Sequence, residues 1–170
     1  DFMICPFCAY NNIGGEDECA GCGENLSSLD GVIPRTKFEE VLMNDPISRL
    51  EPHPPLTVEP QASVQQAVEK MNTAKIGCLL VVSHGDLAGI VTERDVLFKI
   101  MGTKKDLSKT PISAIMTPNP QTLSEDDTLA YALNRMSVYG FRHIPIVRNG
   151  KPVGIISVRD VLKYLSKLFP

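Results

Sequence analysis

The chain of 170 residues contains no tryptophan, and aromatic residues make up only 6% of it. Proteins that bind single-stranded nucleic acid commonly stack bases on aromatic side chains, so this scarcity argues against such a surface. The net charge of −3 gives no general footprint for nucleic acid either. No apolar run approaches about 18 residues and no secretory signal is apparent, so we expect a soluble, cytoplasmic protein that does not enter membranes.

The residues needed for catalysis are also scarce. Only three histidines occur: His53 in a proline-rich stretch, His84 in an expected turn and His143 in an expected strand. None forms a recognisable pair with a nucleophile, and no Walker-type phosphate-binding loop is present. We therefore expect a regulatory protein and not an enzyme.

Four of the five cysteines lie in one short segment, CPFCAYNNIGGEDECAGC, at residues 5–22. Two Cys-x2-Cys pairs, Cys5/Cys8 and Cys19/Cys22, can surround one ion tetrahedrally, and thiolates suit zinc. The pattern resembles a zinc ribbon, which we assign to residues 1–28. A rubredoxin-like iron site is the alternative metal. The alternatives without metal are two disulfides or free thiols, and an intracellular chain disfavours stable disulfides. Four thiolates leave no open coordination position, so the ion is expected to be structural.

The charge of this cysteine segment indicates what it contacts. Residues 1–26 contain no lysine or arginine and include five acids, Asp1, Glu16, Asp17, Glu18 and Glu24. An acidic ribbon is a poor binder of phosphate groups, which favours a protein partner. A nucleic-acid regulator that reads through the ribbon is the competing hypothesis.

The remainder of the chain is an internal duplication. LAGIVTERDVL at residues 87–97 corresponds to PVGIISVRDVL at residues 152–162, and aligning Asp95 on Asp160 gives an offset of 160 − 95 = 65. The same offset matches Thr57 with Thr122 and Met71 with Met136. Such a duplication indicates two equivalent structural halves.

We expect a linker helix within residues 29–45, one repeat at residues 46–108 and a second at residues 109–170. Each repeat is predicted to contain a short extended lead, a helix, two paired strands and a second helix. The helices are expected from Ser63, at residues 92–101, at residues 128–138 and at residues 157–168, and the strands at residues 78–82, 87–91, 143–147 and 153–156. The predicted fold class is α+β, with two pseudo-symmetric repeats that cover each other's apolar faces.

The segments at Thr92–Asp95 and Ser157–Asp160 allow two interpretations. A hydroxyl residue followed three positions later by an acid is a capping-box pattern, which needs no ligand. However, each segment lies where a strand meets a helix, and a helix N-terminus suits an anion while a neighbouring carboxylate can hold both hydroxyls of a ribose. Equivalent positions in both repeats therefore also predict two nucleotide sites.

The duplicated segments resemble a tandem pair of CBS domains, known as a Bateman module. The resemblance rests on Gly-Ile-Val-Thr-x-x-Asp, Gly-Ile-Ile-Ser-x-x-Asp, MTPNPQTL at residues 116–123 and GFRHIPIV at residues 140–147. It covers about residues 46–170. It implies a disc of two CBS repeats with two clefts that bind adenosine compounds such as AMP, ADP, ATP or S-adenosylmethionine.

The resemblance also implies which residues line the clefts, and we name each group after its aspartate. The Asp95 set consists of Asp95, Thr92, Thr117, Thr122, Phe141, Arg142 and His143. The Asp160 set consists of Asp160, Ser157, Thr57, Ile76 and Gly77. The aspartates would hold the ribose. If only one of the two sites binds a phosphorylated ligand, we favour the Asp95 set, because it includes the cationic Arg142 and the histidine.

The predicted function is that of a ligand sensor whose ribbon reports to a partner. A scaffold with empty clefts is a further alternative. Related modules pair as homodimers through helix faces, and apolar stripes that could serve lie at Val96, Leu97 and Ile100 and at Val161, Leu162 and Leu165. The same stripes could instead be intramolecular core.

Overall fold

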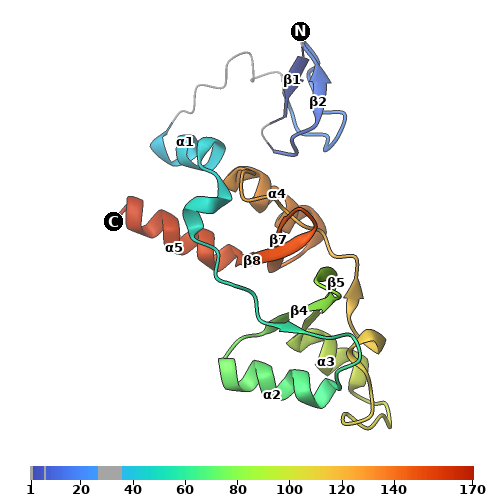
Figure 1. Ribbon diagram of the computed structural model, residues 1–170. Coiled ribbons are helices and arrows are strands. Elements are labelled where there is room, and N and C mark those ends of the chain that lie inside the picture. The colour runs from blue at the N-terminus through green and yellow to red at the C-terminus, as the bar shows by residue number, and fades with distance from the viewer. Residues whose placement is uncertain (1, 6, 27–35) are drawn as a thin grey trace. The chain divides into compact units, whose positions relative to one another are not determined.

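The computed structural model describes residues 2–5, 7–26 and 36–170 (Figure 1). The chain divides into two compact units. The first unit comprises Asp1–Glu51, Ser124–Arg142 and Ile156–Pro170, and the second comprises Pro52–Leu123 and His143–Ile155. The second sequence repeat therefore contributes to both units, its helices to the first and most of its hairpin to the second.

The cysteine segment of the first unit forms a small hairpin. Strand β1 (Phe2–Ile4) pairs antiparallel with β2 (Asn11–Ile13). Its apolar interior is small: among the described residues of the segment, Cys5, Cys19 and Leu26 are the buried hydrophobic ones, with Met3 and Phe7 packed against them. This part of the chain has little hydrophobic stabilisation of its own.

Helix α1 (Lys37–Asn44) lies within the predicted linker and begins after Thr36, whose side chain accepts a hydrogen bond from the Glu39 N–H. The start of the predicted linker, residues 29–35, lies outside the described residues. The stretch that follows contains the short helix η1 (Ile47–Leu50), in which Ile47 is completely buried. The Ile47 N–H donates to the Asp127 carbonyl, so η1 packs within the first unit.

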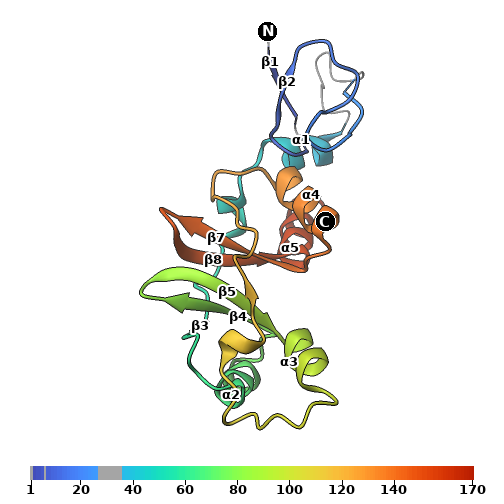
Figure 2. The ribbon, with the colours of Figure 1, turned by 90° about the vertical axis from the view of Figure 1, so that its right-hand side faces the viewer.

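The second unit contains the first repeat in the predicted order (Figure 2). Its helices are α2 (Val64–Ala74), α3 (Glu93–Ile100) and the short η2 (Ile112–Ala114). Apart from the hairpin of the second repeat, its strands are β3 (Thr57–Val58), β4 (Cys78–Ser83), β5 (Asp86–Thr92) and β6 (Thr117–Pro118). They form one sheet in the order β3-β4-β5-β6, with β3 parallel to β4 and the other pairs antiparallel. The core of this unit includes Val64, Met71, Leu79, Val81, Val91 and Ile112.

The second repeat has the same order of elements: α4 (Leu129–Tyr139), β7 (His143–Arg148), β8 (Lys151–Ser157) and α5 (Val158–Leu168). Asn149 and Gly150 both have positive φ, 51° and 77°, which is the hairpin turn that the Asn-Gly pair predicts. The pattern of exposed and buried positions along β5 repeats along β8. Residues that are 65 positions apart in the sequence therefore occupy equivalent positions in the two repeats.

The apolar stripes of α3 and α5 divide between core and surface. Val161 and Leu165 are buried, and Val96 and Ile100 pack against the core of the second unit. Leu97 and Leu162 are 56% and 66% exposed. Each stripe is thus partly intramolecular core and partly open surface. In the described part of the chain, no helix combines the length and the apolar character needed to cross a membrane.

The core of the second unit provides a test of the fold. Leu79 is fully buried in β4, whereas Leu97 is a surface residue of the same type on α3. We expect Leu79→Ala to lower the free energy of unfolding by about 2–5 kcal/mol, because it leaves a cavity. Leu97→Ala should change it by about 0.5 kcal/mol or less. Urea denaturation measures both, and equal effects would contradict the assigned core.

Candidate functional site

The four N-terminal cysteines bring their sulfur atoms together. All four Sγ atoms lie within 4.8 Å of one another, with 3.8 Å between Cys5 and Cys22 and 3.4 Å between Cys8 and Cys19. A tetrahedral zinc site with bonds of about 2.3 Å separates its sulfurs by about 3.8 Å. The cysteines are free thiols, so the disulfide alternative is not what the structure shows. The cluster has the donor set and spacing that a structural metal ion requires.

Nearby N–H groups favour a thiolate within this cluster. The Cys19 sulfur accepts hydrogen bonds from the Gly21 N–H at 3.3 Å and from Asn12 Nδ2 at 3.5 Å. Burial acts to raise the pKa of Cys19, but these donors outweigh burial and lower the pKa to about 6. Burial raises the pKa values of Cys5 and Cys8 instead. Binding of a metal must therefore displace protons from these two thiols, and its affinity should fall as pH falls.

Asn12 contacts the cysteine cluster, which the sequence analysis did not foresee. Its side chain is almost completely buried, its Oδ1 accepts from the Ala20 N–H at 2.9 Å, and its Nδ2 donates to the Tyr10 carbonyl and to the Cys19 sulfur. It thus ties the two Cys-x2-Cys turns together behind the ligands. Its neighbour Asn11 is exposed, and the sequence alone offers no signal that separates the two.

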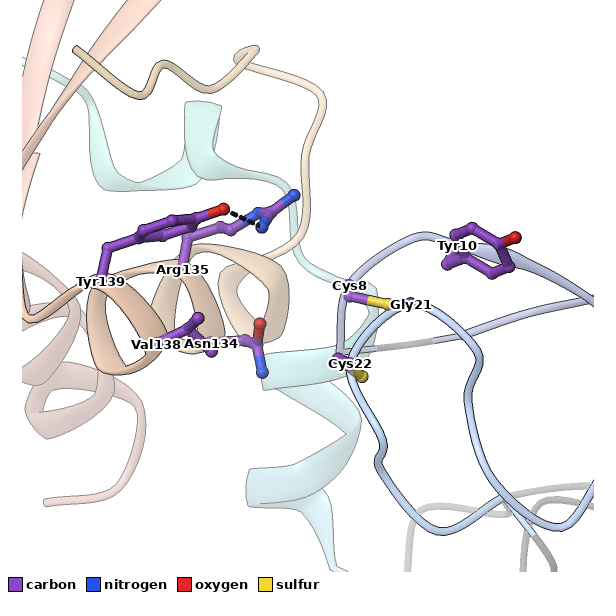
Figure 3. Close-up of a pocket in the computed structure, with 8 residues that line it drawn as sticks. All are labelled: Cys8, Tyr10, Gly21, Cys22, Asn134, Arg135, Val138 and Tyr139. Atoms are coloured by element: carbon purple, nitrogen blue, oxygen red, sulfur yellow. Dashed lines mark hydrogen bonds between the residues drawn. The ribbon is translucent and has the colours of Figure 1, made fainter.

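A cavity of about 340 Å³ lies beside this cluster (Figure 3). It is lined by residues of the cysteine segment and by one face of α4: Cys8, Tyr10, Gly21, Cys22, Asn134, Arg135, Val138 and Tyr139. The Arg135 guanidinium is held in place, because it donates to the hydroxyls of Tyr131 and Tyr139 at 3.1 and 3.2 Å and lies over both rings. The cavity is therefore bordered by a positive charge.

The first predicted aspartate lies at the N-terminus of α3. Asp95 Oδ2 accepts from both the backbone N–H and the hydroxyl of Thr92, at 2.9 and 3.0 Å, and the Asp95 N–H donates back to that hydroxyl. The capping-box interpretation is confirmed here. Asp95 Oδ1 lies 2.9 Å from Lys99 Nζ.

The fifth cysteine, Cys78, is a neighbour of Asp95. Burial, followed by the charge of Asp95, raises the pKa of Cys78 to about 12, so this cysteine is a neutral core residue.

The second aspartate repeats the same cap at the N-terminus of α5. Asp160 Oδ2 accepts from the N–H and hydroxyl of Ser157 at 2.6 and 2.9 Å. Among the residues that the structure describes, no group pairs with its Oδ1. The cap therefore uses one carboxylate oxygen in each repeat, and only Asp160 has the other oxygen free.

The other predicted residues are distributed over both units. Thr57, Ile76, Gly77, Thr92, Asp95, Thr117, Thr122 and His143 belong to the second unit, and Phe141, Arg142, Ser157 and Asp160 belong to the first. Locally, the structure joins each aspartate to its hydroxyl residue. It also places Gly77 against the start of α3, where its carbonyl accepts the Glu93 N–H at 3.0 Å. The Phe141 ring stacks on that of Tyr139. The complete grouping of each set stays a prediction.

The fold is a mixed α/β pair of repeats with an N-terminal four-cysteine cluster. The CBS domain family matches residues 40–102 and 112–167, and the chain belongs to that family. The matched residues include the capped helix N-termini at Asp95 and Asp160.

Relatives share this pair of domains. A CBS domain-containing protein of Arabidopsis thaliana, CBSCBSPB5, is 32% identical over 117 residues, which are 68% of this chain and 21% of that protein. The chain thus spans about a fifth of the length of this relative. An uncharacterized 17.7 kDa protein of Acidianus ambivalens is 34% identical over 110 residues, which are 64% of this chain and 65% of that protein.

Solved structures have the same fold. A protein with CBS domains from Burkholderia ambifaria MC40-6 superimposes with a TM-score of 0.67 at 29% identity, over 73% of this chain and 95% of that one. The CBS domain pair of protein MJ0100 superimposes with a TM-score of 0.61 at 29% identity, over 68% of this chain and 91% of that one. That structure is a complex with 5'-methylthioadenosine and S-adenosyl-L-methionine.

The environment of the cysteine cluster predicts an effect of Asn12 on metal affinity. We expect Asn12→Ala to weaken zinc binding by about 10–100-fold, because it removes a donor to Cys19 and the link between the two turns. Asn11→Ala, an identical change at the exposed neighbour, should leave the affinity unchanged. Competition with a chromophoric chelator measures both. Equal affinities for the two variants would show that Asn12 does not support the ligands.

Proposed function

We propose that this chain is a regulatory module that senses an adenosine compound through its two CBS repeats. The observation that carries the proposal is the free Oδ1 of Asp160 beside a capped helix N-terminus, in a pair of domains whose family includes a solved complex with adenosine compounds. A carboxylate oxygen with open acceptor positions suits ribose hydroxyls, and a helix N-terminus suits an anionic group. We propose that the Asp95 and Asp160 sets supply the ligand contacts.

We further propose that the cysteine cluster binds a structural zinc ion. The four thiols match the tetrahedral spacing, and the N–H donors at Cys19 support ionised sulfur. In this proposal Cys5, Cys8, Cys19 and Cys22 hold the ion, and the acidic surface of the ribbon contacts a protein partner. The ligand acts by favouring one state of the repeats through its differential affinity.

The sensing function is tested by thermal unfolding of zinc-loaded protein with AMP, ADP, ATP, S-adenosylmethionine and GTP. A ligand at 100 times its dissociation constant adds about 2.7 kcal/mol, which raises the melting temperature by about 5–10 °C for a chain of this size. We expect a rise with at least one adenosine compound and none with GTP. The double variant Asp95→Asn/Asp160→Asn should abolish the rise.

Asp126→Asn is the matched control, because Asp126 is exposed and outside both sets. It should retain the full rise in melting temperature. If no adenosine compound stabilises the folded, zinc-loaded protein, the scaffold with empty clefts becomes the better hypothesis.

We propose that two copies of the chain associate through the exposed positions of α3 and α5. Leu97, Phe98 and Met101 are 56%, 70% and 70% exposed at α3, and Leu162 is 66% exposed on α5. Large exposed apolar side chains that are close together on one helix, as Leu97, Phe98 and Met101 are at α3, are typical of an interaction site. The resemblance to modules that pair through helix faces favours a second copy as the partner.

This association predicts that charge on either helix dissociates the dimer. We expect Leu97→Glu and Leu162→Glu to convert a dimer into a monomer in sedimentation velocity, because an unpaired carboxylate would be buried at the interface. Ile4→Glu, at a residue 68% exposed on β1, should leave the dimer intact. A dimer that only Ile4→Glu dissociates would place the interface on the ribbon.

A further inference from the structure

The two duplicated aspartates differ in one neighbour. The residue one helical turn after Asp95 is Lys99, and the 65-residue offset places Tyr164 at the equivalent position after Asp160. Lys99 Nζ lies 2.9 Å from Asp95 Oδ1 and also donates to the Ile115 carbonyl at 2.7 Å. The ammonium group is thus held between a carboxylate and a carbonyl within one unit.

Tyr164 makes a different contact. Its hydroxyl donates to Oδ2 of Asp45 at 2.5 Å, and Asp45 lies at the end of α1. Asp45 therefore engages Tyr164, and no cation from α5 pairs with Asp160 in the described part of the chain. The two repeats use equivalent positions on their last helices for different purposes.

The number of free acceptor positions follows from these contacts. A carboxylate offers about four lone-pair positions, two on each oxygen. In both repeats the cap occupies two positions on Oδ2. Lys99 occupies a third on Asp95, so one remains there, whereas Asp160 keeps both positions on Oδ1. The two hydroxyls of a ribose need two acceptors, and only Asp160 provides them without displacing another group.

Displacing Lys99 is unfavourable for a neutral hydroxyl. The contact with Asp95 is charge-assisted, which makes it stronger than a hydrogen bond from a sugar hydroxyl. Asp95 is 14% exposed at its side chain, so solvent screens this pair only partly. The second contact, with the Ile115 carbonyl, keeps the ammonium group from turning away.

We propose that Lys99 closes the Asp95 site to ribose, so that the chain binds one adenosine compound, at Asp160. The inference rests on the proposed function and specifies which of its two sites is active. It reverses the preference that Arg142 and His143 indicate from sequence, because residues that attract phosphate do not free the carboxylate that must hold the sugar.

Isothermal titration of zinc-loaded protein, with AMP, ADP, ATP and S-adenosylmethionine titrated separately, tests this proposal. The wild type should bind one equivalent of one of these ligands per chain. Asp160→Asn should weaken that binding about tenfold or more, because a charge-assisted acceptor is lost, and Asp95→Asn should leave it unchanged. The two variants are matched, since each keeps a side-chain oxygen for its helix cap, and circular dichroism confirms that both are folded.

Lys99→Met provides an independent arm, because it removes the ammonium group while keeping a long apolar side chain. It should add a second equivalent of binding, which the further change Asp95→Asn removes. Lys163→Met is the control, since Lys163 is an exposed lysine on α5, and it should keep one equivalent.

The outcomes separate this inference from the proposed function. Two equivalents in the wild type, or a single equivalent that Asp95→Asn abolishes and Asp160→Asn spares, would overturn the role of Lys99 while supporting the sensor. No binding by any folded variant, Lys99→Met included, would overturn the sensor itself.

Discussion

The ligand-binding hypothesis depends on one interaction, the hydrogen bonding of an aspartate carboxylate to the hydroxyl residue at each strand-to-helix junction. In both repeats an apolar strand ends at a hydroxyl residue, and an aspartate three positions later accepts two hydrogen bonds from it. This cap ends the strand, starts the helix and fixes the aspartate at the helix N-terminus. Because Oδ2 of each aspartate accepts the hydrogen bonds of the cap, the acceptor positions left for a ligand depend on what Oδ1 contacts.

Capping and ligand binding are therefore compatible interpretations of the same residues. The capping box was sufficient to explain the sequence pattern, and the structure confirms it. A cap through Oδ2 alone leaves Oδ1 for a second partner. In the first repeat that partner is Lys99, and in the second repeat it is absent from the described residues. Two repeats with the same order of elements can thus differ in the acceptor oxygens that their aspartates leave free.

Much of this organisation was predictable from local sequence. The constant offset identified the repeats, the Asn149-Gly150 pair identified a hairpin, and the spacing of Ser63 and Gln66 identified a helix start that the structure shows as a full capping box. The burial of Ile47 was not predictable, because proline content indicates where a helix cannot continue but not whether a segment packs. Its backbone N–H bonds a carbonyl far away in sequence, and such contacts leave no local pattern.

The two missed residues differ in the signal that could have found them. Lys99 follows Asp95 by four positions on a predicted helix, a spacing that commonly brings opposite charges together, so the ion pair was visible in principle. Asn12 has no such signal. Its importance comes from burial between two turns that only the folded ribbon brings into contact, and the exposed Asn11 beside it has the same side chain.

The small interior of the cysteine segment bears on how a sensor of this kind would be organised. Among the described residues of this segment, two cysteines and one leucine are fully buried and only a few partly buried side chains pack on them, so apolar burial alone recovers little of the conformational entropy lost on folding. If a metal is bound, its binding free energy becomes folding free energy for this segment. The second unit, in contrast, has a larger core built mainly of aliphatic side chains. The stability of the ribbon would then depend on metal and pH, while the state of the repeats would depend on the adenosine ligand. A partner that contacts the ribbon would bind only when the ribbon is folded around its metal.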